Sequence, residues 1–240
     1  MNNLEKGSIL SSVDIIKNII IGNIIIYNPD IKCTKENLKL FQNINFEDFI
    51  KSKVIKDSFP NLENCSYDIS LGEYYYKKND SFQEVFNPNY IQDFHSYWEL
   101  GKVNTIQTLE EVEKYKLKIN DQYIILQPNE FILAHSNEFI GGRNNITTML
   151  KCKSTMARAG IAICNDAGWG DIGYINRWTL EIKNFNSVPI VLRIGQKIGQ
   201  IIFLQSSIPL SEYQGKYQDS FDIYNIIEGW NHKSMLPKIK

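Results

Sequence analysis

The sequence predicts an all-β fold, arranged as a barrel or a sandwich. From residue 121 onward, short runs of apolar and β-branched residues alternate with Pro, Gly and Asn, which is the spacing of closely packed strands. The run RWTLEIKNF alternates apolar and polar residues with a period of two, as a half-buried strand does. The 240 residues, 43% of them hydrophobic, suffice for one core of ordinary size. We therefore expect residues 1–240 to form a single domain.

The first elements are expected to be a short helix and a strand. Ser11 can cap a helix that starts in VDIIKNII and ends near Gly22. The β-branched run IIIYNP then predicts a strand, which Asn28 and Pro29 end in a turn. CSYDISLGEYYY predicts the next strand, with a bend at Gly72.

Two polar stretches, at about 30–62 and 77–120, are interpreted as insertions. FEDFIKSKVI predicts a helix in the first, and TLEEVEKYK predicts one or two helical turns in the second. The tail, at about 211–240, shows no periodicity, so no regular element is expected there. Between the second insertion and the tail, the expected strands are QYIILQP, EFILAHS, ITTMLKCKS, GIAIC, RWTLEIKNF, PIVLRIG and QIIFLQ.

Composition excludes several classes of function. A formal net charge of -1 argues against a nucleic-acid-binding surface. The apolar run from Ile15 to Tyr27 is too short and too polar to span a membrane, and we find no signal peptide before it. Four cysteines without a CxxC pair and three scattered histidines do not predict a structural zinc site. We expect a cytoplasmic protein with reduced thiols, which binds neither nucleic acid nor membrane.

The segment KSTMAR carries two cations, Lys153 and Arg158, on either side of the hydroxyls of Ser154 and Thr155. In a turn with exposed backbone N–H groups, such side chains can hold phosphate oxygens. The same residue types are also common on solvated surfaces, so the segment alone decides nothing.

The turn DAGWGDIGY follows, and it is rich in glycine. Gly168, Gly170 and Gly173 permit backbone torsions that other residues avoid, so the chain can bend tightly around a small ligand. Asp171 can then accept a hydrogen bond from a sugar hydroxyl, and Tyr174 can stack beneath the sugar. A plain hairpin turn with an exposed Asp explains the same residues.

Glu181 shares the polar face of the strand RWTLEIKNF with Thr179 and Lys183. On an exposed face it would be a solvated carboxylate beside Lys183. In a pocket, burial would raise its pKa from the reference of about 4.3. Such a carboxyl group can accept and return a proton.

Taken together, these segments resemble the dCTP deaminase branch of the deoxyuridine triphosphatase (dUTPase) superfamily. KSTMAR resembles that family's R-S-S-L-A-R segment, with Lys in place of the first Arg. CSYDISLG, LRIGQKIGQIIF and GKYQ resemble its first motif, its G-x-x-I-x-Q segment and its lid. The family's Ala, Asp, Gly-aromatic and Glu positions match Ala167, Asp171, Gly173, Tyr174 and Glu181.

The resemblance implies a distorted jelly-roll, dUTPase-like β-barrel with a short N-terminal helix and an elaborated insertion. It also implies a homotrimer with active sites between subunits, and a C-terminal lid formed by the tail. The expected ligands are dCTP, with dUTP or dTTP as further nucleotides.

The implied reaction is hydrolytic deamination of dCTP to dUTP and ammonia. Zinc deaminases use H-x-E and P-C-x-x-C motifs, which this sequence lacks, so no zinc is expected. By resemblance, Glu181 is the general base and acid, Ser154 and the Ala167 carbonyl hold the water, and Arg158 organises the reacting centre. Mg²⁺ would arrive with the triphosphate. The residues that would bind substrate are Lys153, Thr155, Asp171, Tyr174, Thr179, Tyr213, Lys216 and Gln218.

By the same resemblance, Lys153, Thr155 and Lys216 would bind the triphosphate. Asp171 would bind the 3′-hydroxyl, and Tyr174 would exclude a ribose 2′-hydroxyl. The lid reads KYQDS, whereas the family's lid usually reads K-Y-Q-G-Q, so the role of Gln218 is open.

Three alternatives remain at this point. A bifunctional dCTP deaminase and dUTP diphosphatase would release dUMP, because Asp171 stands where the diphosphatase branch activates its water. A plain dUTP diphosphatase is less well supported, because that branch requires no carboxylate at Glu181. An inactive nucleotide-binding or regulatory homologue would keep the fold without turnover.

Overall fold

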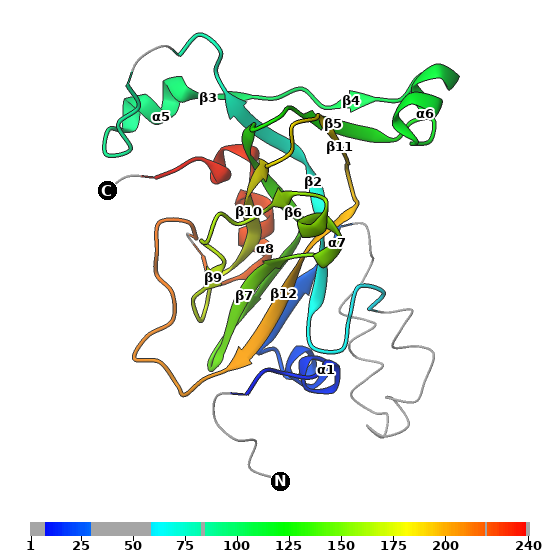
Figure 1. Cartoon of the computed structure of the whole chain (residues 1–240). Coiled ribbons are helices and arrows are strands. Elements are labelled where there is room, and N and C mark those ends of the chain that lie inside the picture. Colours follow the sequence, from blue (N-terminus) through cyan, green and yellow to red (C-terminus); the bar gives the residue numbers. More distant parts are fainter. Residues whose placement is uncertain (1–7, 30–58, 83–84, 219, 239–240) are drawn as a thin grey trace.

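The computed structural model describes residues 8–29, 59–82, 85–218 and 220–238. Within these ranges the chain is built mainly of antiparallel strands, with a few short helices (Figure 1). The prediction of a mainly β fold is therefore confirmed. The helix predicted in FEDFIKSKVI lies outside the described residues. None of the described helices is both long enough and apolar enough to cross a membrane.

The larger sheet has nine strands in the order β8-β10-β6-β2-β12-β7-β9, with β1 also beside β6 and β3 also beside β2. The strand that carries Glu181 is β10, and it pairs along most of its length with the long strand β6. The bounds are β1 Ile24–Tyr27, β2 Tyr67–Lys78, β3 Trp98–Leu100, β6 Phe131–Gly142, β7 Ile146–Cys152, β8 Ile161–Ala162, β9 Trp169–Gly170, β10 Ile175–Asn184 and β12 Lys197–Gln205.

The smaller sheet has three strands in the order β11-β5-β4. Its strand β4 belongs to the second insertion, and the sheet lies near the top of Figure 1. All seven strand segments expected after residue 120 contain a strand, although GIAIC contributes only the two residues of β8. The bounds are β4 Asn104–Thr105, β5 Gln122–Leu126 and β11 Ile190–Arg193.

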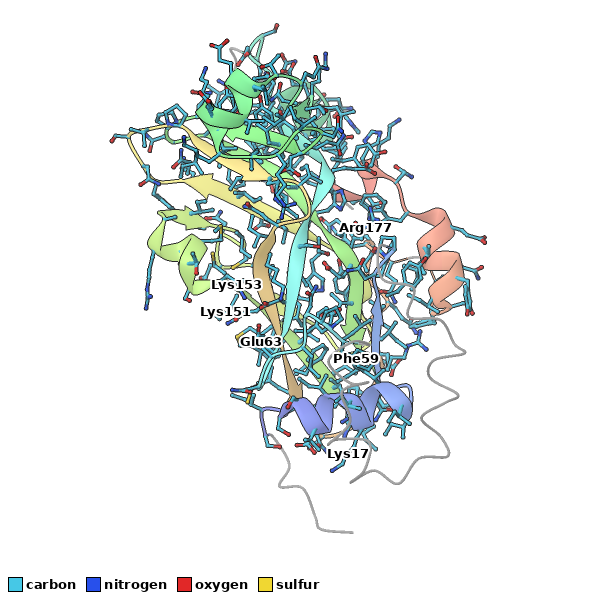
Figure 2. The ribbon with its side chains drawn as sticks, turned by 90° about the vertical axis from the view of Figure 1, so that its right-hand side faces the viewer. Lys17, Phe59, Glu63, Lys151, Lys153 and Arg177 are labelled. Atoms are coloured by element: carbon cyan, nitrogen blue, oxygen red, sulfur yellow. The ribbon has the colours of Figure 1, made fainter. Side chains whose placement is uncertain are left out.

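The predicted N-terminal helix is α1, Ser12–Ile20. The Ser11 side chain accepts a hydrogen bond from the backbone N–H of Asp14, which satisfies one of the free donors at the helix start. Three of the four isoleucines of α1 are buried, and the helix lies across one end of the main sheet with Lys17 on its outer side (Figure 2). Gly22, at φ +82°, ends the helix before β1.

The second insertion carries two short helices, α5 (Ile91–Tyr97) and α6 (Leu109–Tyr115). The helical turns predicted in TLEEVEKYK are confirmed as α6. A reciprocal capping box starts this helix: the Thr108 side chain accepts from the N–H of Glu111, and the Glu111 carboxylate accepts from the N–H of Thr108. Lys116 ends it in the left-handed conformation.

The alternation predicted for RWTLEIKNF is present in β10. Trp178, Leu180 and Ile182 point into the main core and are at most 4% exposed. Each apolar side chain of this size stabilises the fold by about 1.5–3 kcal/mol when buried. The opposite face of β10 carries Thr179 and Glu181 and is only partly covered by other residues. We call these polar side chains the polar row of β10.

The tail differs from the sequence prediction, because it contains the helix α8 (Ile223–Gly229) and the 3₁₀ helix η1 (His232–Met235). Asp222 caps α8 by accepting from the N–H groups of Tyr224 and Asn225. The apolar side of α8 packs on Phe139 and Ile175 of the main sheet. The expectation of a tail without regular structure is therefore wrong.

Candidate active site

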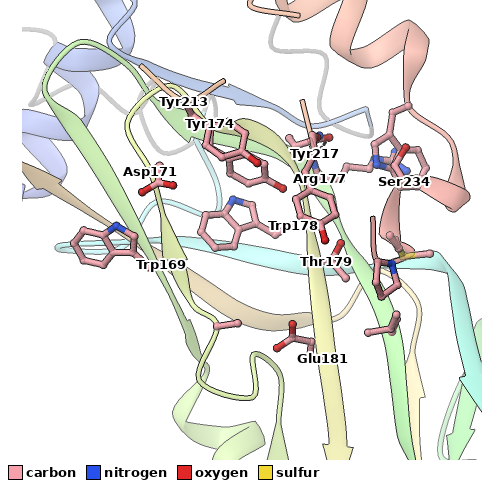
Figure 3. A pocket seen from close by; sticks show the side chains of 16 residues that line it. Trp169, Asp171, Tyr174, Arg177, Trp178, Thr179, Glu181, Tyr213, Tyr217 and Ser234 are labelled. Carbon is pink, nitrogen blue, oxygen red and sulfur yellow. Dashed lines mark hydrogen bonds between the residues drawn. The ribbon is translucent and has the colours of Figure 1, made fainter. Parts of the chain in front are cut away.

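A cavity of about 350 Å³ lies along the polar row of β10. This volume falls within the range typical of small-molecule sites. Its wall comes from β10, the loop around β9, the segment near Tyr213, and the C-terminal segment from Trp230 to Pro237 (Figure 3). Six of the predicted site residues line it: Ala167, Asp171, Tyr174, Thr179, Glu181 and Tyr213.

Glu181 is placed inside this cavity rather than in bulk solvent. Its Oε2 atom is buried and has no hydrogen-bond partner among the described residues. Burial raises the pKa of the Glu181 carboxyl above its ordinary value, because the charged form loses hydration. A carboxyl group tuned in this way, within a cavity, suits proton transfer.

The loop before β9 brings Ala167 to Glu181. Cys164 forms an isolated parallel bridge with Glu181, and the N–H of Ala167 donates to the Cys164 carbonyl at 2.6 Å. Between them, Asn165 and Asp166 adopt positive φ angles of 35° and 70°, which Asn and Asp tolerate better than most residues. This tight turn fixes the backbone of Ala167 at the cavity wall.

The glycines of the loop serve two different purposes. Only Gly173 has the predicted unusual torsion, at φ +96°. Gly168 and Gly170 have ordinary torsions, so the predicted reason for them is wrong. A side chain at Gly168 would collide with the Leu150 carbonyl, and one at Gly170 with Trp178. These two glycines are needed because the loop lies directly against its neighbours.

Tyr174 forms the aromatic floor of the cavity. Its ring meets those of Trp178 and Tyr213 edge to face, at centroid distances of 5.7 and 5.4 Å. Burial raises the pKa of Tyr174, so the phenol stays neutral. Asp171 lies nearer the outside, and its carbonyl accepts from the N–H of Tyr174 at 3.0 Å to close the turn.

Comparison with known proteins assigns the chain to a family. A family model described as dCTP deaminase-like matches residues 45–206, which is more than half of the chain. The chain belongs to the dCTP deaminase-like family. The resemblance inferred from the sequence motifs is thereby confirmed.

Several similar proteins bear the name dCTP deaminase, dUMP-forming. The protein from Nanoarchaeum equitans is 33% identical over 166 residues, which cover 67% of this chain and 81% of that protein. The protein from Tropheryma whipplei is 29% identical over 179 residues, covering 73% and 83%. The protein from Persephonella marina is 38% identical over 104 residues, covering 43% and 57%.

Two solved structures are also similar. The 2′-deoxycytidine 5′-triphosphate deaminase of Agrobacterium tumefaciens has a TM-score of 0.49 and 16% identity, covering 84% of this chain and 48% of that one. The EIAV dUTPase has a TM-score of 0.33 and 24% identity, covering 40% and 78%.

In this member of the dCTP deaminase-like family, KSTMAR forms the short helix α7 (Ser154–Arg158), whereas the sequence predicted a turn. Ser154, Thr155 and Arg158 are exposed on α7 and do not line the cavity of their own chain. Lys216 is likewise exposed and outside the cavity wall. One chain thus does not bring all the predicted site residues together.

Gln218 is buried and fixes the tail to β10. Its Oε1 accepts from the N–H of Ile175 at 2.6 Å, and its Nε2 donates to the Gly173 carbonyl at 2.8 Å. Next to it, the Asn176 side chain donates to the Tyr217 carbonyl at 2.9 Å. Both ends of the Gln218 amide are thus engaged by backbone, and its contact with substrate stays a prediction.

Of the ten cavity residues that were not predicted from the sequence, four matter most here: Arg177, Trp230, Ser234 and Met235. Arg177 precedes Thr179 and Glu181 at a spacing of two on the same strand, so the alternation could have placed it on the same face. The other three lie in the tail, where no element was expected. Met235 is buried against Tyr76 and Leu133, which closes the cavity at the far end of β10.

One histidine belongs to this C-terminal segment, and a second lies against it. Nδ1 of His232 lies 2.6 Å from the Tyr76 hydroxyl, which ties η1 to β2. The ring of His135 lies 4.7 Å from that of Trp230. Because His135 is fully buried, desolvation lowers its pKa to about 4, and it is neutral at physiological pH.

Metal ligands are not clustered in the part of the chain that the structure describes. No group of three or more His, Cys, Asp or Glu side chains is arranged there to hold an ion. The cavity instead combines a carboxyl group of raised pKa, a guanidinium and several aromatic rings.

Proposed function

We propose that this chain hydrolyses dCTP in two steps to dUMP, releasing ammonia and pyrophosphate. Membership of the dCTP deaminase-like family and the names of the relatives support this proposal. The observation that carries it is Glu181, a carboxyl group of raised pKa that shares one cavity with Asp171. The sequence favoured release of dUTP, but the relatives are described as dUMP-forming, which favours the bifunctional alternative.

The deamination step is assigned to Glu181. Its carboxylate removes a proton from water as the oxygen attacks C4 of cytosine, and it delivers that proton to N3. It then takes the proton of the new C4 hydroxyl and delivers it to the amino group, so that the C4–N bond breaks and ammonia leaves. The Ala167 carbonyl and Ser154 orient the water, and Arg158 organises the reacting centre. A well-placed proton-transfer group accelerates such a step by about 10²–10⁴-fold.

A second copy of the chain supplies Ser154 and Arg158 in this proposal. These two residues lie on exposed α7 and outside the cavity that holds Glu181. The cavity would therefore be completed by α7 of a neighbouring copy. This accords with the homotrimer that the family resemblance implies.

The rest of the nucleotide is assigned to the outer part of the site. Tyr174 packs under the deoxyribose and excludes a 2′-hydroxyl, while Thr179 and Tyr213 contact the nucleoside. Asp171 is assigned to the 3′-hydroxyl and also to activation of the water that attacks the α-phosphate. Lys153, Thr155 and Lys216 bind the triphosphate, which carries Mg²⁺ as part of the substrate.

Product analysis tests the proposal. The chain is incubated with dCTP and Mg²⁺, the nucleotides are separated chromatographically, and ammonia and pyrophosphate are measured in parallel. We expect dUMP, ammonia and pyrophosphate in equal amounts. Accumulation of dUTP would show a deaminase alone, and dUMP formed only from added dUTP would show a diphosphatase. No product from either nucleotide would identify a binding protein without turnover.

A further inference from the structure

A buried carboxylate joins two lysines at the edge of the proposed phosphate site. Asp68 on β2 is completely buried. Its Oδ2 lies 2.5 Å from Nζ of Lys153 and 3.3 Å from Nζ of Lys197. The side chains of Lys153 and Lys197 are 27% and 40% exposed, so solvent reaches both of them.

Sheet pairing explains why the three groups meet. Strand β12 lies between β2 and β7, and Asp68 is paired with Gln200 on β12. A register shift between Lys197 and Gly199 adds a residue to β12, and this turns Lys197 toward the face that carries Asp68. Lys153 directly follows the end of β7, so it reaches the same carboxylate from the other side.

The charges of this group do not cancel. One carboxylate faces two ammonium groups, which leaves a net charge of about +1 at an accessible point. A buried carboxylate is costly unless it is paired, so Asp68 holds both lysines in place. Each ammonium has three N–H donors and uses one on Asp68, which leaves donors for a further anion. The lysines are thus ordered before any ligand binds.

We propose that Lys197 is a second phosphate-binding residue, and that Asp68 positions Lys197 and Lys153 together for the polyphosphate chain of the nucleotide. This inference rests on the proposed function, which assigns Lys153 to the triphosphate. Two fixed cations match a ligand with several adjacent negative phosphates better than a monophosphate. The ligand class is therefore a nucleoside triphosphate, recognised through its phosphates and not through its base.

Steady-state kinetics and inhibition by inorganic tripolyphosphate test this role in the full-length chain. Lys197→Met removes the charge, and Lys197→Arg restores it. The control is Lys102→Met, which removes the charge of an exposed lysine between β3 and β4. We expect Lys197→Met to raise KM for dCTP and Ki for tripolyphosphate about tenfold or more, with kcat within about twofold. Lys197→Arg should recover most of the loss, and Lys102→Met should change neither constant.

Two results would contradict the proposals, and each would contradict a different one. If Lys197→Met lowers the melting temperature but leaves KM and Ki unchanged, Lys197 is only a counter-ion of Asp68 and the proposal fails. Lys197→Gln repeats the measurement if the Met variant does not fold. If the wild-type chain has no activity on dCTP, the proposed function fails. The binding of tripolyphosphate, measured by calorimetry, then still decides the role of Lys197.

Discussion

The guanidinium carbon of Arg177 lies 4.4 Å from the centre of the Trp230 ring. The same group lies 5.1 Å from the centre of the Phe139 ring. Arg177 belongs to the strand that carries Glu181, and Trp230 belongs to the C-terminal segment, so this contact joins the two across the cavity wall.

The contact between Arg177 and Trp230 should be measurable as a coupling energy. A double-mutant cycle with Arg177→Gln and Trp230→Ala should give about 0.5–2 kcal/mol in the free energy of unfolding by urea, since a cation over a partly desolvated indole is worth that much. A cycle that pairs Arg177→Gln with Leu109→Ala, on the exposed side of α6, is the control and should show additivity. Equal couplings in both cycles would mean that the ring contact contributes nothing specific.

Replacement of Glu181 by Gln should abolish deamination but keep binding of dCTP. The amide has nearly the shape of the carboxyl group, but it cannot accept the proton from water. We expect kcat to fall by at least about 10²-fold, measured as ammonia release, with the Kd for dCTP nearly unchanged. Glu228→Gln, on the exposed end of α8, is the matched control. Turnover within tenfold of the wild type would rule out the assigned role.

The same substitution should change how stability depends on pH. Because the folded pKa of Glu181 lies above its ordinary value of 4.5, the folded chain binds this proton more tightly than the unfolded chain. Stability is therefore lost as pH rises from the ordinary pKa through the raised one. Glu181→Gln should melt at a higher temperature than the wild type at pH 8, and the difference should disappear near pH 4. A constant difference between pH 4 and pH 8 would argue against the raised pKa.

His135 should make the fold sensitive to acid in another pH range. Its pKa is about 4 in the folded chain and about 6.5 in the unfolded chain, so the unfolded state binds more protons between these values. Stability should fall by about 3 kcal/mol as pH drops from 6.5 to 4. His135→Gln should remove this contribution in urea titrations at several pH values. His95→Gln, on the exposed side of α5, should leave it intact.

Tyr174 should decide between deoxyribose and ribose. If the ring packs under the sugar, CTP is a poor substrate, and Tyr174→Ala should lower the ratio of kcat/KM for dCTP over CTP by about tenfold or more. Tyr174→Phe keeps the ring and should keep the ratio. Comparable rates on CTP and dCTP in the wild type would overturn the sugar assignment.

The longer strands of the two sheets were predictable because each carries its own local pattern, whereas the short strands β3, β4 and β9 were not predicted. The period of two in β10 placed Glu181 on the partly covered face, and the Ser11 cap placed α1. The helix α8 was missed, although Ile223, Ile226, Ile227 and Trp230 follow the spacing i, i+3, i+4, i+7. Four apolar residues in a polar tail are few, yet here they suffice because the main sheet offers them an apolar surface.

Motif spacing predicted some residues that lie together on one cavity, but not how the predicted residues are arranged in space. Motif spacing indicated Ala167, Asp171 and Glu181, and the structure places all three on one cavity. Spacing along the chain cannot show that Ser154 and Arg158, only a short distance away in sequence, lie outside that cavity. It also cannot reveal contacts that depend on register, such as the one between Asp68 and Lys197, because a single extra residue in β12 creates it.

The cavity wall gives the protein an optical reporter of its own. Of the four tryptophans, Trp169, Trp178 and Trp230 line the cavity, and Trp98 alone is packed elsewhere, in the cluster around Tyr76. Their emission depends on contact with water and on neighbouring groups that quench it. A nucleotide that enters beside Glu181 would change the water contact and the quenching neighbours of all three indole rings. Occupancy could therefore be followed by intrinsic fluorescence, without a label and independently of turnover.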